Sequence, residues 1–239
     1  MSEHESCQCE EEMIIEEALP SIPLIGDPAP SFTAVTTKGT MNFPEDYKGK
    51  WVILFSHPAD FTPVCTTEFM TFASMQQEFR DLNCELIGLS IDSHFSHIAW
   101  LRTIEEKIEY NGMKNLKVDF PVIADLSMDV AYKYGMVQPE ASDTQAVRAV
   151  FFIDPEATVR ALIYYPLENG RNFDELKRIL QAMQMSDKHK VATPANWRPG
   201  DRVIIPPPST TEIAQERVKG AGEEYQCLDW FLCLKDVKE

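Results

Sequence analysis

This sequence of 239 residues contains no long apolar run, since none approaches the roughly 18 residues that a membrane-spanning helix requires. Positive charge is scarce as well: the sequence has 22 lysines and arginines but 38 acidic residues, which gives a formal net charge of −16. This imbalance argues against nucleic acid and against an anionic membrane surface as partners. The first five residues (MSEHE) are acidic and lack the apolar segment of a signal peptide, so we expect a cytoplasmic protein.

Cysteine is present, but it lacks the spacing of a zinc site. The six cysteines are Cys7, Cys9, Cys65, Cys84, Cys227 and Cys233. No two have Cys-x-x-Cys spacing and no matching histidine pair follows, so we expect neither a zinc site nor a cofactor. In a chain of this size without an export signal, cysteines are more often free, catalytic or metal-bound than parts of a disulfide framework. For Cys7 and Cys9, in an acidic tail, solvated thiols, metal binding and an auxiliary redox role all stay open.

The remaining pattern divides the chain into three parts. Residues 1–24 form an acidic N-terminal tail, residues 25–186 form the main domain, and residues 187–239 form a proline-rich C-terminal arm. The arm ends in an unusually apolar stretch, residues 225–234 (YQCLDWFLCL). Because about 50 residues cannot hold much core of their own, we expect the arm to pack on the main domain or on a second subunit.

Strands and helices alternate along the main domain, which indicates an α/β sheet with helices on both faces. Strands are predicted at 31–35, 51–56, 85–91, 120–124, 147–154 and 158–165, and the last two form a β-hairpin. Helices are predicted at 66–82, 93–110, 127–134 and 210–219, and a further one opens at Asn172. The apolar face expected for the helix at 93–110 consists of Phe95, Ile98, Leu101, Ile104 and Ile108.

The stretch from Pro58 to Cys65 follows a buried strand and precedes a helix. Thr62 is a suitable N-cap, with a hydroxyl to cap the helix, and Pro63 suits the first helical position. Cys65 then falls in the first turn, where unpaired N–H groups and the helix dipole favour a thiolate. A lone cysteine is usually a small buried apolar residue. Its position after a parallel strand, where α/β sheets place their sites, favours a nucleophile instead.

Other candidate residues have simpler interpretations. Cys84 begins a predicted strand, and we interpret it as a structural residue packed in the core. His94-x-x-His97 resembles half of a metal site, but a solvated or capping role is favoured because no further ligand follows at useful spacing. Gly88-x-Ser90-x-Asp92 lacks the second glycine of a nucleophile elbow.

Arg148 begins an otherwise apolar strand. Because a buried charge is costly when it is unpaired, we expect this arginine to have a partner or a functional role. A structural salt bridge and the orientation of an anion are equally compatible with the pattern. Glu68 lies three residues after Cys65, hence on the same face of the helix, and could hold this arginine.

Together these residues resemble a known family. Pro58, Thr62 and Cys65 match the P-x-x-x-T-x-x-C signature of peroxiredoxins, and Arg148 lies where that family carries its active-site arginine. The longer string HPADFTPVCTTE at 57–68 looks like the 1-Cys-type branch, and the resemblance continues through GRNFDE at 170–175 and VATPANW at 191–197. It covers roughly residues 24–205. The resemblance implies a thioredoxin-like fold, with a central mixed sheet flanked by helices, and a small C-terminal dimerisation domain.

The resemblance also implies roles for matching residues. Cys65 would be the peroxidatic cysteine, which attacks the peroxide and becomes a sulfenic acid. Thr62 would hydrogen-bond the peroxide and thiolate, and Arg148 would stabilise the thiolate and the leaving oxygen. Pro58 would close the pocket. Supporting positions are expected at His57, Glu68 and Arg171.

The C-terminal arm departs from the simplest members of that branch, because it carries two further cysteines. We expect the sulfenic acid to condense with one of them, with Cys227 favoured over Cys233, within one chain or across a dimer interface. Cys233 would then take over by thiol–disulfide exchange. Apolar packing of both thiols is the alternative. The implied partners are a peroxide, a thioredoxin-type reductant and further copies of the chain, as a dimer or a decamer.

Two other classes of protein compete with a peroxidase as interpretations of this sequence. A thiol–disulfide oxidoreductase would carry Cys-x-x-Cys at the helix start, where this chain has Thr62 three residues before Cys65. A holdase chaperone or a redox-sensing scaffold is compatible with large assemblies in the family and could coexist with peroxidase activity.

Overall fold

The computed structural model describes residues 22–237 apart from 143 and 223, so residues 1–21 of the acidic tail, with Cys7 and Cys9, lie outside the described residues. Its larger sheet has the strand order β2-β1-β5-β4-β3-β6-β7. The strands of this sheet are β1 (Phe32–Thr36), β2 (Gly39–Phe43), β3 (Trp51–Ser56), β4 (Cys84–Ser90), β5 (Val122–Ala124), β6 (Arg148–Ile153) and β7 (Val159–Tyr165). Because β3, β4 and β5 are parallel while β6 and β7 form an antiparallel hairpin beside them, the sheet is mixed, as expected.

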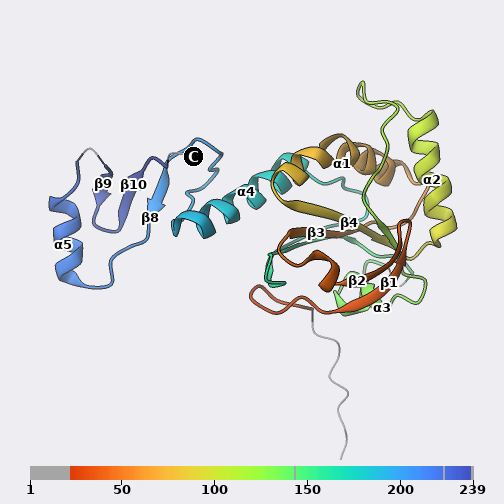
Figure 1. Cartoon of the computed structure of the whole chain (residues 1–239), viewed down its shortest axis with the longest axis horizontal. Helices are drawn as coiled ribbons and strands as arrows, with labels where there is room; N and C mark the ends of the chain where they lie inside the picture. Colours follow the sequence, from red (N-terminus) through yellow and green to blue (C-terminus); the bar gives the residue numbers. More distant parts are fainter. Residues whose placement is uncertain (1–21, 143, 223, 238–239) are drawn as a thin grey trace, which may run out of the picture.

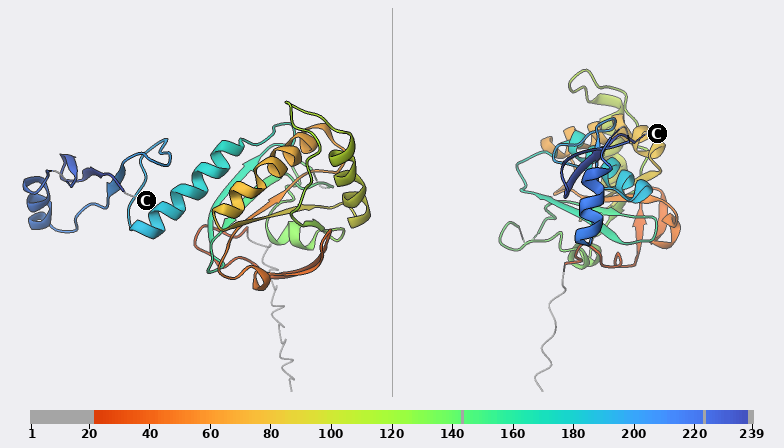
Figure 2. Two further views of the ribbon diagram at one scale, coloured as in Figure 1. Left: turned by 45° about the horizontal axis from the view of Figure 1, so that its top comes forward. Right: turned by 90° about the vertical axis from the view of Figure 1, so that its left-hand side faces the viewer.

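Helices cover both faces of this sheet (Figures 1 and 2). The helices are α1 (Pro63–Asp81), α2 (His94–Lys107), α3 (Asp129–Lys133), α4 (Phe173–His189) and α5 (Thr211–Lys219), and a short 3-10 helix spans Glu45–Tyr47. α1, α2 and α4 pack on one face and α3 packs on the other. Among the described residues, no helix is both long and apolar enough to span a bilayer.

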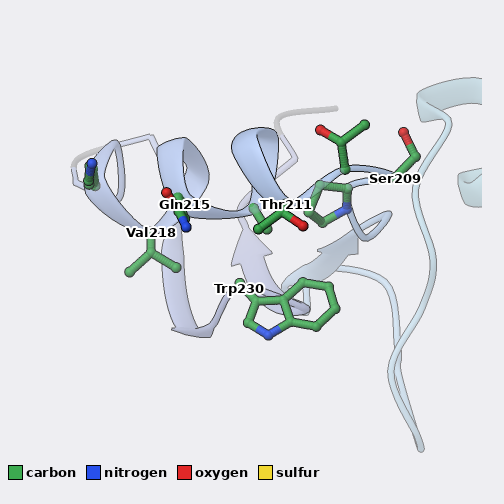
Figure 3. A pocket seen from close by; sticks show the side chains of 9 residues that line it. Ser209, Thr211, Gln215, Val218 and Trp230 are labelled. Carbon is green, nitrogen blue, oxygen red and sulfur yellow. The ribbon is translucent and has the colours of Figure 1, made fainter.

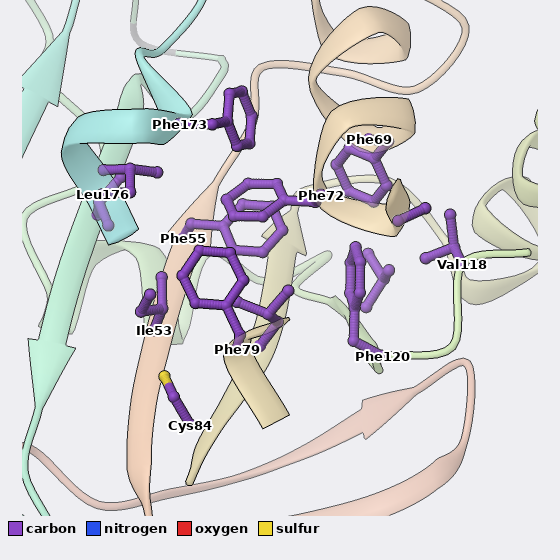
Figure 4. Packing of buried hydrophobic residues seen from close by; sticks show 14 of the residues in the cluster. Ile53, Phe55, Phe69, Phe72, Phe79, Cys84, Val118, Phe120, Phe173 and Leu176 are labelled. Atoms are coloured by element: carbon purple, nitrogen blue, oxygen red, sulfur yellow. The ribbon is translucent and has the colours of Figure 1, made fainter. Parts of the chain in front are cut away.

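The central strand β3 is buried on both sides, which explains its unbroken apolar sequence. Ile53 and Phe55 point to the face covered by α1 and α4, whereas Val52 and Leu54 point to the opposite face. Phe55 stacks on Phe72 with ring centroids 4.1 Å apart, in the aromatic cluster of Figure 4. This cluster fixes α1, and therefore its first turn, against the carboxyl end of β3.

The apolar face predicted for α2 is wrong in part. Phe95 and Ile98 are 72% and 52% exposed, whereas His97, Trp100 and Ile104 are buried. The helix carries apolar residues on two adjacent stripes, so periodicity alone does not choose between them. The stripe that contains Trp100 is the one that packs on α1, where the indole N–H donates to the Thr66 hydroxyl at 3.2 Å.

The C-terminal arm is joined to the main domain through α4 (Figure 1). It contains α5 and a separate sheet of β8 (Val203–Ile205), β10 (Leu232–Lys235) and β9 (Gln226–Asp229). Its buried residues pack on the last turns of α4, around the fully buried Trp197. α4 runs through the boundary predicted at 186 and ends at His189. Leu228, Trp230 and Phe231 remain exposed, so the described part of the main domain does not cover the apolar hairpin of the arm.

Candidate active site

The site begins at the junction of β3 and α1. Thr62 is the N-cap residue and Pro63 is the first helical residue, as predicted. The expected hydroxyl cap is wrong, however, because Thr62 Oγ1 donates to the carbonyl of Ala59 at 2.8 Å. With its proton used in this way, the hydroxyl oxygen can only accept a further hydrogen bond. Pro58 is buried at the start of the same loop.

Cys65 lies in the first turn of α1 and its side chain is fully buried. Arg148, the first residue of β6, reaches it from the neighbouring strand, with Nη1 at 3.3 Å from Sγ. The guanidinium is held by three further hydrogen bonds: Nε and Nη2 donate to the carbonyl of Leu167 at 2.9 and 2.7 Å, and Nη1 donates to Glu68 Oε2 at 2.7 Å. The salt bridge expected as one use of this arginine is therefore present, and the same guanidinium faces the sulfur; the orientation of an anion stays a prediction.

Glu68 lies between two arginines. Arg171 donates to its carboxylate through the backbone N–H and Nε, both at 2.9 Å to Oε1, and through Nη2 at 2.6 Å to Oε2. Burial alone would raise the pKa of Glu68, but the charges and hydrogen bonds of Arg171 and Arg148 outweigh it and lower the pKa. Arg171 also donates to the carbonyl of Ser56 at 3.0 Å and lies over the ring of Phe55. The carboxylate thus fixes the arginine that faces Cys65.

His57 is buried beside this group and belongs to a second polar cluster. Its Nε2 lies 3.0 Å from Asp60 Oδ1, and Asp60 Oδ2 lies 2.8 Å from His97 Nδ1. The solvated or capping role predicted for His97 is wrong, because its side chain is fully buried. Among the described residues, these three side chains are the one group whose ligand atoms lie close enough together to hold a metal ion.

Sequence reasoning overlooked Asp60 and the contribution of His97. A signal for both was present: Asp60 follows His57 by three residues within a short loop, and His97 precedes Trp100 by three residues on a helix. Cys84, by contrast, is buried as predicted, and burial raises the pKa of its thiol strongly. Ser90 ends β4 and its hydroxyl donates to Asp92 at 2.8 Å, so it is no nucleophile elbow.

The two arm cysteines are bonded to each other as a disulfide. Cys227 on β9 and Cys233 on β10 face one another in the antiparallel register. Cys233 is fully buried and Cys227 is half-buried. Arg171 and Cys65 lie near the start of α4, whereas the sheet that carries the two cysteines follows its end, and 17 residues of helix span about 25 Å. The structure therefore does not bring these cysteines to Cys65 of the same chain.

A groove of about 700 Å³ lies in the arm, between α5 and the β9–β10 hairpin (Figure 3). Trp230, Val218 and Thr211 are among its lining residues. No residue predicted for the site lines it. The residues that the sequence predicts for the site and this groove are thus in different parts of the chain.

Comparison with known proteins identifies both parts of the chain. The model of the AhpC/TSA family matches residues 25–162, and the model of the C-terminal domain of 1-Cys peroxiredoxin matches residues 182–221. A peroxiredoxin of Methanosarcina mazei is 72% identical over 214 residues, which cover 90% of this chain and 98% of that protein. A peroxiredoxin of Aquifex aeolicus is 51% identical over 227 residues, with 91% and 98% covered.

Solved structures agree with these relatives. A yeast mitochondrial 1-Cys peroxiredoxin, described with its thiol-resolving mechanism via glutathione and thioredoxin systems, superposes with a TM-score of 0.76 at 38% identity. The alignment covers 90% of this chain and all of that one. Peroxiredoxin 6 of Arenicola marina gives a TM-score of 0.75 at 31% identity, with 90% and 99% covered. The fold and family expected from the sequence are confirmed, and the chain belongs to the peroxiredoxins, which are thiol peroxidases.

Proposed function

We propose that Cys65 is the peroxidatic cysteine and that it reduces hydrogen peroxide and organic hydroperoxides. The observation that carries this proposal is the position of Arg148 Nη1, 3.3 Å from Cys65 Sγ and tethered to Glu68 at 2.7 Å. A fixed positive charge beside a thiol at a helix start favours the thiolate. The same donor is available to stabilise charge on a departing oxygen.

The chemical step follows from these contacts. The Cys65 thiolate attacks the terminal oxygen of the peroxide, the S–O bond forms, and the O–O bond breaks. The electron pair leaves with the departing hydroxide or alkoxide, which takes a proton to become water or alcohol, and Cys65 becomes a sulfenic acid. Thr62 accepts a hydrogen bond from the peroxide O–H, because its own proton is donated to Ala59. Pro58 shields the sulfenic acid, while Glu68 and Arg171 hold Arg148 in place.

The resolving step takes place between two chains in this proposal. The thiol of Cys227 on one chain attacks the sulfenic acid of Cys65 on another, which releases water and forms a mixed disulfide. Cys233 then attacks Cys227, frees Cys65 and leaves a disulfide within the arm. This proposal is supported by the bonded pair of cysteines in the arm and by the length of α4 that separates them from Cys65 of the same chain.

The arm also supports a homodimer. Leu228, Trp230 and Phe231 expose apolar surface on the hairpin that carries the disulfide, and a second copy of the chain would cover it. We therefore propose the division into a tail (1–24), a peroxidase domain (25–186) and a dimerisation arm (187–239). A decameric ring of such dimers and a cytoplasmic location stay predictions from the sequence.

A thioredoxin-type protein is the proposed reductant. It supplies the two electrons and two protons that return the Cys227–Cys233 disulfide to thiols. The yeast relative described with glutathione and thioredoxin systems supports a dithiol or glutathione source. Stopped-flow peroxide consumption with thioredoxin, thioredoxin reductase and NADPH tests this directly.

Cysteine variants test the complete cycle. Cys65→Ser should abolish peroxide reduction, whereas Cys84→Ser, at a buried thiol outside the site, should retain it. Cys233→Ser should accumulate an interchain disulfide between Cys65 and Cys227 after one equivalent of peroxide, seen on non-reducing gels and mapped by mass spectrometry. Retained activity in Cys65→Ser would refute the peroxidase site. If Cys227→Ser and Cys233→Ser both form the same species linked to Cys65 as wild type, the resolving role is wrong.

A further inference from the structure

A buried histidine on α2 has no part in the mechanism proposed above. His97 Nδ1 lies 2.8 Å from Asp60 Oδ2 and Nε2 lies 3.1 Å from the carbonyl oxygen of Ile123. The ring is fully buried, so water does not compete for either nitrogen. His97 thus connects β5, on which Ile123 lies, to the loop between β3 and α1, on which Asp60 lies.

The partners of His97 determine where its protons are. A carbonyl oxygen only accepts hydrogen bonds, so Nε2 carries a proton. Burial alone would raise the pKa of Asp60, but its hydrogen bonds with His57 and His97 outweigh burial and lower the pKa to about 2. The carboxylate of Asp60 faces the other nitrogen, Nδ1, so both nitrogens of His97 are used and the ring links Asp60 to Ile123.

The same carboxylate sets the tautomer of His57. Burial, the largest cause, lowers the pKa of His57, so its ring is neutral and holds one proton. Because Nε2 faces Asp60 Oδ1 at 3.0 Å, the proton is on Nε2. Nδ1 is then the unprotonated nitrogen, and it has no hydrogen-bond partner among the described residues.

The loop that carries Asp60 needs this support. Phe61 has a φ of +54°, in the left-handed region, which costs a bulky residue about 1–2 kcal/mol. The side chain of Asp60 is held by the two histidines, and its backbone N–H donates to Asp92 Oδ2 at 2.9 Å. Thr62, which we propose accepts a hydrogen bond from the peroxide, follows Phe61 directly. Without the clamp, Phe61 would relax and Thr62 would move.

We propose that His97 is a positioning residue for the peroxide reaction: its ring, bonded to Asp60 and to the carbonyl of Ile123, clamps Asp60, and so holds Thr62 in register with Cys65 and His57 in one tautomer. The proposal rests on the proposed function of Cys65. His97 touches neither the sulfur nor the substrate in this arrangement, and it acts only through Asp60.

His97→Phe removes both hydrogen bonds and keeps an aromatic ring in the core. We expect the second-order rate constant of Cys65 oxidation to fall about 100-fold, because a displacement near 1 Å costs that much. Reduction of the arm disulfide should keep its rate. His97→Asn restores one N–H toward Asp60 and should recover about tenfold of the loss by returning a hydrogen bond to a charged group. The matched control is His94→Phe, one turn earlier on the same helix, which should behave as wild type.

NMR of isotopically labelled histidine gives a readout that a merely structural role would not produce. In wild type, His57 should show the Nε2–H tautomer, and in His97→Phe this preference should weaken because Asp60 is no longer held. A His57 ring that carries its proton on Nδ1 in wild type would overturn the proposal even if His97→Phe does not fold. An unchanged oxidation rate in folded His97→Phe would also overturn it. Failure of the proposed function looks different, because Cys65→Ser would then react with peroxide as fast as wild type.

Discussion

Replacing Glu68 by glutamine tests the buried charge cluster most directly. The carboxylate accepts four hydrogen bonds, of which two reach Oε1 from Arg171 and two reach Oε2 from Arg148 and Arg171. In Glu68→Gln the amide oxygen can keep the two bonds at the Oε1 position. The amide NH₂ then faces Nη1 of Arg148 and Nη2 of Arg171, so two charge-assisted bonds become contacts between donors.

The magnitude follows from these two lost bonds. Hydrogen bonds to charged groups contribute about 1.5–3 kcal/mol each, and breaking a buried ion pair costs about 3–5 kcal/mol. We expect the free energy of unfolding to fall by about 4 kcal/mol in urea titrations. In a chain of this size each kcal/mol changes Tm by about 2–4 °C, so Tm should fall by about 10 °C. Arg148 also loses its tether, so Cys65 oxidation should slow by at least about tenfold.

The pH dependence of this difference has a defined sign. The pKa of Glu68 is lower in the folded protein than its ordinary value of 4.5. Its contribution to stability is therefore fully present above that value and is lost as the pH falls through the lower, folded pKa. The gap in unfolding free energy between wild type and Glu68→Gln should be constant near neutral pH and should narrow only below about pH 4.5.

Glu78→Gln is the matched control, on the same helix and with the same chemical change. Glu78 pairs with Lys177 at the surface, where its side chain is 48% exposed. Such pairs contribute about 0–1 kcal/mol, so this variant should unfold almost as wild type does. If the two variants lose equal stability, or if the Glu68→Gln gap persists unchanged into acid, the clamp that we assign to Glu68 is wrong.

Three further predictions concern other parts of the chain. Arg148→Met removes the donor beside Sγ and should slow Cys65 oxidation by about 100- to 1000-fold in stopped-flow traces, and a change within threefold would contradict its proposed role. Burial raises the pKa of the Cys84 thiol, so iodoacetamide should modify it only after denaturation, and rapid labelling of folded protein would disprove its inert packing. Trp197→Ala should cost the arm about 3–5 kcal/mol and raise hydrogen exchange in β8 and β10 alone; equal loss of protection in β3 would show that the arm is not a separate unit.

Local sequence signals were sufficient for the start of the site. Pro63 suits only the first turn of a helix, and the apolar run of β3 requires burial on both faces, so the position of Cys65 followed from its neighbours in sequence. The charge of Arg148 at the start of a buried strand likewise signalled a partner. Its two partners, Glu68 and the sulfur, could be named because both lie within one turn of a single helix.

Other features depend on contacts that no local pattern encodes. His97 meets Asp60 because α2 packs beside the loop after β3, 37 residues away in sequence. The stripe of α2 that is buried was chosen by packing against α1, where two stripes were equally apolar. The β9–β10 hairpin was not predicted, although thiol–disulfide exchange between Cys227 and Cys233 was expected, because the pairing of the two strands depends on their register.

The charges around Glu68 have a consequence for the oxidised protein. Two guanidinium groups and one carboxylate leave a surplus of one positive charge, which a thiolate at Cys65 would neutralise in the proposed mechanism. A neutral sulfenic acid removes that compensation and leaves a buried charge without a counterion, which is costly. Oxidation would therefore destabilise the closed first turn of α1, because the uncompensated charge beside it is more stable when it is hydrated. The product of the peroxide reaction would itself favour opening of the helix end, at the moment when a partner thiol must reach the sulfur.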